Sequence, residues 1–190
     1  MTPDDKAVPL QPRGPAPDGA ERRSRLRQYQ VQLMERMQAA RSGSAAAGKE
    51  LGLVIGQERC LLDLTQVGEI VPAPAISPVP LAQDWYLGLA NIRGNLTGIV
   101  DLARYRGTPA GQPGSDSRVV TFGAGLGFNC ALLATRVLGL RDLAAMRAEE
   151  DDPMAADWAR QRFSDAESQR WTRIDLALLV REARFLHVAL

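Results

Sequence analysis

Histidine and cysteine are the first residue types to test for chemistry, because an imidazole can act as a general base and a thiolate as a nucleophile. The chain has one histidine, His187, and no serine or cysteine in a recognisable nucleophile turn accompanies it. Cys60 and Cys130 are far apart and have no C-x-x-C or H-x-x-x-H companion, so they do not match a zinc site. Both lie in apolar runs, which favours buried free thiols over a disulfide. The sequence therefore predicts no catalytic histidine, no metal site and no cofactor.

A glycine-rich stretch and several carboxylates offer two further kinds of chemistry. Residues 123–128 read G-A-G-L-G-F, but this spacing is not G-x-G-x-x-G, and the stretch leads into an alternating strand instead of a helix N-terminus. We therefore expect a turn there and not a phosphate-binding loop. The carboxylates lie in or beside predicted strands, which favours surface or turn positions over a catalytic pair. They are Asp63, Glu69, Asp101, Asp142 and Asp175.

Charge and hydropathy argue against a nucleic-acid-binding domain and against a membrane-spanning protein. Of 190 residues, 23 are basic and 22 acidic, a net charge of +1, whereas nucleic-acid-binding domains are usually clearly basic. No secretory signal opens the sequence, and no apolar stretch approaches the roughly 18 residues that span a bilayer. We therefore expect a cytoplasmic protein without direct membrane insertion. The run Arg22–Arg27 predicts the solvated face of a helix, while a docking face for an acidic partner or for anionic lipid stays open.

The elements that must position these residues fall into three regions. Residues 1–19 carry five prolines and two glycines, which predicts a disordered tail. Apolar residues at spacings of three and four predict an amphipathic helix over residues 20–41, and small residues predict a linker up to residue 48. From residue 49 to residue 190 the apolar period changes to two, which predicts one domain built of strands.

Short strands separated by Gly and Pro turns favour a β-barrel or sandwich for this domain. The strands are expected at residues 50–56, 60–64, 67–71, 89–92, 96–102, 118–123, 128–134, 137–143 and 171–176. Arg93-Gly94-Asn95 predicts the tip of a hairpin between two of them. Helical turns are expected at Asp84–Leu87 and Leu178–Glu182. A short helix is expected to begin at Asp152-Pro153 and to run to Phe163.

Two segments resemble the signature of CheW-like adaptor domains: CLLDLTQVGEIV at residues 60–71 and LGLANIRGNLTGIVDL at residues 87–102. In that family a V-x-E-I-like element leads through a proline-containing connector to a G-x-x-N-L-R-G hairpin and a strand ending in V-D-L. The matching positions are Gly88, Asn91, Ile92, Arg93, Gly94, Ile99, Val100, Asp101 and Leu102. The resemblance covers about residues 50–180. The flanking segments Glu21–Arg27 and Trp171–Leu176 resemble the PilI branch, the adaptor of pilus-linked chemosensory systems.

This resemblance implies a mainly β fold of two small β-barrel subdomains of the SH3 or OB kind, with an N-terminal helix and short C-terminal helices. It implies a non-catalytic adaptor that couples the cytoplasmic tip of a chemoreceptor to the regulatory domain of a CheA-type histidine kinase. In the PilI branch the output would be type IV pilus twitching motility. By position, Val67, Glu69 and Arg93 would contact the receptor, and Asn91 and Gly94 would form the hairpin.

Other interpretations of these positions stay open. Val67 would also suit burial in the barrel, Glu69 a solvated strand position, and Arg93 an ion pair within the chain. The sequence departs from the family at Asn95 and Gly98, where aliphatic residues are common, and this loosens the expected hairpin.

Two other function classes compete with the adaptor. An OB-like nucleic-acid-binding barrel would need a basic face with aromatic residues, but only 5% of the residues are aromatic and none interleaves with the arginine run. An enzyme with an unfamiliar site, using Asp101 and Arg93, would need a small-molecule ligand.

Overall fold

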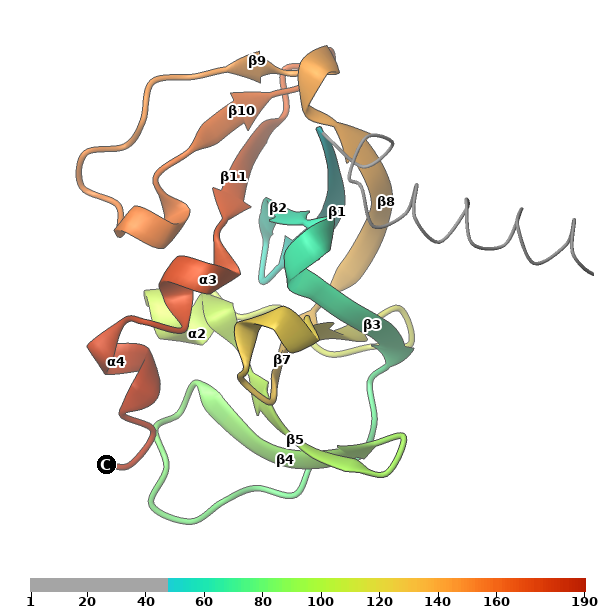
Figure 1. Ribbon diagram of the computed structural model, residues 1–190, viewed down its shortest axis with the longest axis vertical. Coiled ribbons are helices and arrows are strands. Elements are labelled where there is room, and N and C mark those ends of the chain that lie inside the picture. Colours follow the sequence, from blue (N-terminus) through green and yellow to red (C-terminus); the bar gives the residue numbers. More distant parts are fainter. Residues whose placement is uncertain (1–47) are drawn as a thin grey trace, which may run out of the picture. The chain divides into compact units, whose positions relative to one another are not determined.

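The computed structural model describes residues 48–190 (Figure 1). The tail predicted over residues 1–19 lies outside the described residues. The helix and linker predicted over residues 20–48 also lie outside them, apart from Gly48. Within residues 48–190, no helix is long and apolar enough to span a membrane.

Two β-sheets make up most of the described chain, which confirms the predicted mainly β class. The first sheet has the order β8 (Arg136–Asp142), β1 (Lys49–Ile55), β2 (Glu58–Asp63), β11 (Arg170–Ile174), β10 (Arg162–Ser164) and β9 (Arg147–Ala148). The second sheet has the order β3 (Val67–Pro72), β6 (Arg118–Phe122), β7 (Cys130–Ala134), β5 (Asn95–Val100) and β4 (Tyr86–Ile92). Neighbouring strands are antiparallel except for the parallel pairs β2/β11 and β5/β7. The chain therefore leaves the first sheet after β2 and returns to it at β8.

The helices of the described chain are short, and most of them follow the end of a strand. They are α2 (Leu102–Arg106), α3 (Leu176–Leu179) and α4 (Ala183–Leu186), with 3-10 turns η1 (Leu64–Gln66), η2 (Ala124–Leu126), η3 (Leu143–Ala145) and η4 (Asp157–Ala159). Asp101 caps α2 by accepting from the backbone N–H groups of residues 103 and 104, and Asp175 caps α3 in the same way. These caps end the preceding strands earlier than the sequence predicted, at Val100 and Ile174.

One large apolar core is shared by both sheets and the three α-helices. Its fully buried members include Leu53 of β1, Val120 of β6 and Leu132 of β7. Trp85 stacks on Phe185 of α4 at 5.7 Å between ring centroids, so the C-terminal helix is anchored in this core. A second, smaller core lies on the other face of the second sheet and contains Ala90, Ile92, Ile99, Val119, Ala131 and Leu133. Burying an Ile, Val or Leu side chain contributes roughly 1.5–3 kcal/mol to the stability of the fold.

Two predicted helical segments are wrong, and in both the chain pairs with the next strand in the sequence. At Asp84–Leu87 a turn covers residues 84–85 and β4 begins at Tyr86, opposite Val100. The helix predicted from Asp152-Pro153 to Phe163 is replaced by η4 and β10, because residues 162–164 pair with β11. Tertiary pairing of this kind overrides the local helical period. The helical turn predicted at Leu178–Glu182 is shifted toward the N-terminus, since α3 covers Leu176–Leu179.

Candidate functional site

A tight hairpin joins β4 and β5 at the predicted position. Its two turn residues are Arg93 and Gly94, with φ of 50° and 89°, so Asn95 already belongs to β5. A side chain on Gly94 would meet no atom within 4 Å, so glycine is favoured there by its backbone conformation and not by crowding. The Gly94 backbone N–H donates to the side-chain oxygen of Asn91 at 2.8 Å. The two predicted hairpin residues therefore fix a turn that presents Arg93 at its tip.

A β-bulge in β3 positions Glu69. Val67 pairs with Phe122 and Ile70 with Val120, so residues 68 and 69 together lie opposite Thr121. The Thr121 hydroxyl accepts from the Glu69 backbone N–H at 2.7 Å and donates to the Glu69 carbonyl at 3.3 Å. A Cβ on Gly68 would stand only 2.5 Å from the Thr121 hydroxyl oxygen, so this bulge requires a glycine.

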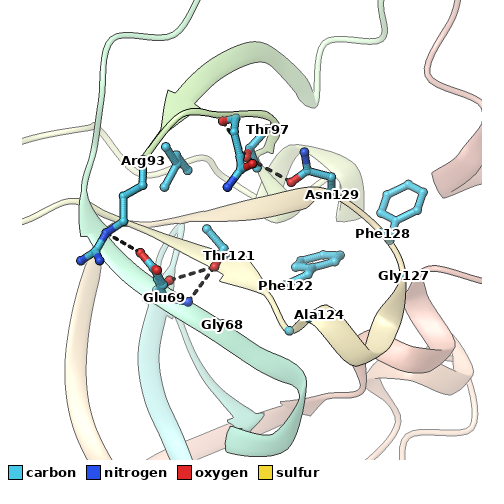
Figure 2. Close-up of a pocket in the computed structure, with 13 residues that line it drawn as sticks. Gly68, Glu69, Arg93, Thr97, Thr121, Phe122, Ala124, Gly127, Phe128 and Asn129 are labelled. Atoms are coloured by element: carbon cyan, nitrogen blue, oxygen red, sulfur yellow. Dashed lines mark hydrogen bonds and ion pairs between the residues drawn. The ribbon is translucent and has the colours of Figure 1, made fainter.

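Glu69 and Arg93 form an ion pair, with 2.8 Å between a carboxylate oxygen and the guanidinium Nε (Figure 2). β3 and β4 are the two edges of the second sheet, so this pair connects edges that are four strands apart in the pairing order. The sheet must therefore curl strongly enough to bring its edges together, as a small barrel does. Both side chains remain exposed, Arg93 at 75% and Glu69 at 47%. An exposed pair contributes only about 0–1 kcal/mol to folding, so a binding partner can replace it at little cost.

A cavity of about 460 Å³ opens beside the ion pair, and we call it the sheet-edge groove. Figure 2 shows Thr97 and Asn129 on one side of it and Thr121 and Phe122 on the other. Thr97 donates to the side-chain oxygen of Asn129 at 3.2 Å, and the Asn129 amide donates to the Leu96 carbonyl at 2.6 Å. The remaining lining residues are Gly68, Glu69, Ile92, Arg93, Asn95, Gly123, Ala124, Gly127 and Phe128. The groove thus offers an ion pair, hydrogen-bonding groups and aromatic surface to one partner.

Val67 does not line the sheet-edge groove. Its side chain is half-buried and packs against the shared core, which is the alternative that the sequence left open. The structure therefore brings together Glu69 and Arg93, supports them with Asn91 and Gly94, and sets Val67 apart. Contact of these residues with a receptor stays a prediction.

Thr97, Thr121 and Asn129 were missed by the sequence analysis. Thr121 stands in the apolar run R-V-V-T-F and Thr97 in N-L-T-G-I-V, so a polar residue inside an apolar strand was the available signal.

The other candidate residues have structural roles. Asp101 is 6% exposed and bonds the α2 backbone and Arg104, whereas Arg93 pairs with Glu69, so the structure does not join Asp101 and Arg93 into one site. Cys60 and Cys130 are buried free thiols, as predicted, and desolvation by burial raises the pKa of each to about 12.

The glycine-rich stretch has the conformation that the sequence predicted. The stretch 123–128 forms η2 and a turn at Gly127, with φ of 63°, so the predicted turn is confirmed. Among residues 48–190, no group of three or more His, Cys, Asp or Glu side chains is arranged to hold a metal ion.

Comparison with known proteins identifies relatives of this chain. The family model of the CheW-like domain matches residues 50–184. The chain is 26% identical over 168 residues to "Protein PilI" of Pseudomonas aeruginosa, covering 87% of this chain and 90% of that protein. It is 30% identical over 91 residues to "Chemotaxis protein CheW" of Helicobacter pylori, covering 45% of this chain and 55% of that protein.

A solved structure shows the same fold. The scaffolding protein TtCheW from Thermoanaerobacter tengcongensis superposes with a TM-score of 0.57 and 19% identity, covering 67% of this chain and 88% of that chain. The sequence-based resemblance is thereby confirmed, including the likeness to PilI. With its two sheets, its N-I-R-G hairpin and a family match over most of its length, the chain belongs to the CheW-like domain family.

Proposed function

We propose that this protein is a non-catalytic adaptor of a bacterial chemosensory pathway, which binds the cytoplasmic tip of a chemoreceptor through the sheet-edge groove. The observation that carries the proposal is the Glu69–Arg93 ion pair, because it places the charged residues of the family signature together at an exposed groove. Its relatives include a chemotaxis protein CheW and a PilI protein.

The groove offers a partner both charged groups and apolar contact area. An exposed arginine at a tight turn reaches a partner surface with little loss of chain freedom, and arginine is enriched among the residues that dominate binding energy. Glu69 gives a second charge of opposite sign, so a partner with complementary charges is held in one register. Phe128, which is half-buried, supplies apolar contact area beside the charged and amide groups of the groove, and Phe122 beneath it belongs to the core.

The second partner in this proposal is the regulatory domain of a CheA-type histidine kinase, bound by another surface so that receptor and kinase are held in one complex. The PilI relative covers most of the chain, which favours a pilus-linked pathway and twitching motility as the output. Such a protein acts in the cytoplasm, needs no cofactor and turns over no substrate.

An affinity purification from lysate of the source organism tests the proposal. The full chain and its Arg93→Ala variant serve as baits, and Arg181→Ala is the matched control because Arg181 is an exposed arginine remote in sequence from the groove residues. The wild type and the control are expected to retain a chemoreceptor and a CheA-type kinase, and Arg93→Ala is expected to lose the receptor. Retention of nucleic acid or unrelated enzymes without a kinase would refute the proposal.

A further inference from the structure

Three arginines stand on the face of the first sheet that points away from the shared core. In the strand register, Arg59 of β2 lies opposite Val54 of β1, and Val54 lies opposite Arg136 of β8. Leu53 and Ile55, on either side of Val54 in β1, point into the core, so Val54 points to the opposite face of the sheet. Residues paired across strands share a face, and Arg59 and Arg136 therefore point away from the core as Val54 does. Arg141 stands opposite Glu50 on the same face. We call Arg59, Arg136 and Arg141 the basic face.

Trp171 holds two members of the basic face in place. The guanidinium carbon of Arg59 lies 6.0 Å from the indole centroid of Trp171, and that of Arg141 lies 5.1 Å away. A Cβ on Gly52 would stand 2.9 Å from the Arg141 side chain and 3.1 Å from the indole, so the glycine in β1 makes room for this stack. A guanidinium stacked on a ring keeps its N–H edge available for a carboxylate, as in the exposed Arg59, and less freedom is lost when the carboxylate binds. Arg141 is half-buried, and one of its Nη atoms donates to the Leu138 carbonyl at 3.4 Å.

Within residues 48–190, none of the three arginines of the basic face forms an ion pair. Two carboxylates of the same face, Glu50 and Asp63, are already paired with Arg173. The nearby carboxylate of Asp165 already accepts from the Trp171 indole N–H at 2.8 Å and from two backbone N–H groups. The neighbouring carboxylates are therefore engaged within the chain, whereas the exposed guanidinium groups of Arg59 and Arg136 form no ion pair within residues 48–190.

We propose that the basic face is a second docking surface, which binds an acidic segment of a partner protein through its aspartate and glutamate carboxylates. Arginine favours this chemistry because its planar fork binds a carboxylate through two parallel hydrogen bonds. A protein segment fits better than a nucleic acid because the aromatic ring of this face, Trp171, is only 1% exposed and cannot stack on bases. The surface lies on the first sheet, whereas Glu69 and Arg93 belong to the second, so it goes beyond the proposed receptor contact.

Binding of a fluorescein-labelled oligoglutamate peptide to the full chain, followed by anisotropy at about 0.15 M salt, tests this inference. The variant Arg59→Glu/Arg136→Glu reverses two exposed members of the basic face. Each single reversal is made as well, and Arg181→Glu, which changes the net charge by the same amount as a single reversal, is the matched control. The double variant is expected to raise the Kd at least about tenfold, because charge-assisted contacts are lost. The control is expected to leave the Kd nearly unchanged, and all of these variants are expected to keep the wild-type thermal unfolding curve.

Several results would overturn the inference. These are the absence of saturable peptide binding by the wild type, an equal loss of affinity in Arg181→Glu, and a double variant that binds as the wild type does. Competition supplies a further test with single-stranded DNA of matched charge. If the DNA binds more tightly than the peptide and responds to the same substitutions, the face is a nucleic-acid surface and the acidic-protein assignment is wrong.

Discussion

Reversing the charges of the Glu69–Arg93 pair separates its role in binding from its role in folding. In the wild type the two charged groups are 2.8 Å apart. Glu69→Arg replaces this attraction with repulsion between two guanidinium groups, and Arg93→Glu replaces it with repulsion between two carboxylates. Both side chains are exposed, so solvent screens the repulsion and each single reversal is expected to cost at most about 1 kcal/mol of folding free energy. For a chain of this size, that corresponds to a fall in Tm of roughly 2–4 °C.

The effect on binding is expected to be larger. An arginine at the centre of an interface typically contributes about 2 kcal/mol or more, so each reversal is expected to weaken binding of a chemoreceptor hairpin fragment roughly 30-fold or more. Isothermal titration calorimetry gives the Kd, and differential scanning calorimetry of the same samples gives the Tm.

The double reversal Glu69→Arg/Arg93→Glu provides the decisive comparison. It restores an ion pair within the chain, so the Tm is expected to return close to the wild-type value. Affinity for the receptor fragment is expected to stay low, because the charges presented to the partner remain exchanged. If the double reversal restores affinity together with Tm, the pair acts only by holding the two sheet edges, and our reasoning about direct contact is refuted.

Three further predictions concern the fold that supports the groove. Gly94→Ala is expected to lower the free energy of unfolding, measured in urea, by about 1–2 kcal/mol, because φ is 89° at this position. Asn91→Ala removes a single exposed hydrogen bond and is expected to cost less. Equal losses in the two variants would contradict this account. Phe185→Ala is expected to lower stability by roughly 3–5 kcal/mol, since this ring is 1% exposed and stacks on Trp85, and a loss below about 1 kcal/mol would show that α4 is not anchored. The pKa values of Cys60 and Cys130 are raised from 9.0 to about 12 by burial, so their contribution to stability is complete below pH 9 and is lost as pH rises toward 12. Iodoacetamide at mildly alkaline pH is accordingly expected to label these thiols only after unfolding, and rapid labelling of the folded protein would contradict their burial.

The strands could be predicted from sequence where one face of a sheet is buried and the other is exposed. Alternation of apolar residues predicted β1, whose Leu51, Leu53 and Ile55 are all buried, although Glu50 and Gly52 on its other face are buried as well. The segments at residues 84–87 and 152–163 could not be predicted in this way. Residues 86–87 and 162–163 are extended because they pair with β5 and β11, and the apolar spacing inside each segment does not register that pairing.

The same limit applies to the sheet-edge groove. The family signature located Glu69 and Arg93, and the glycine after Arg93 indicated the hairpin. That these two residues meet depends on the bulge opposite Thr121 and on the curl of the second sheet, which are long-range properties. Val67 illustrates the converse, because a position carried over from the family signature packs against the core instead of lining the groove.

Formation of a ternary complex is the most direct test of the adaptor function. The full chain would be mixed with the cytoplasmic hairpin of a chemoreceptor and the regulatory domain of a CheA-type kinase from the same organism, and the assemblies measured by sedimentation velocity. The account predicts a complex of all three proteins for the wild type. For Arg93→Ala it predicts a complex with the kinase domain alone. A wild-type protein that binds neither partner, or an Arg93→Ala variant that assembles the full complex, would contradict the account.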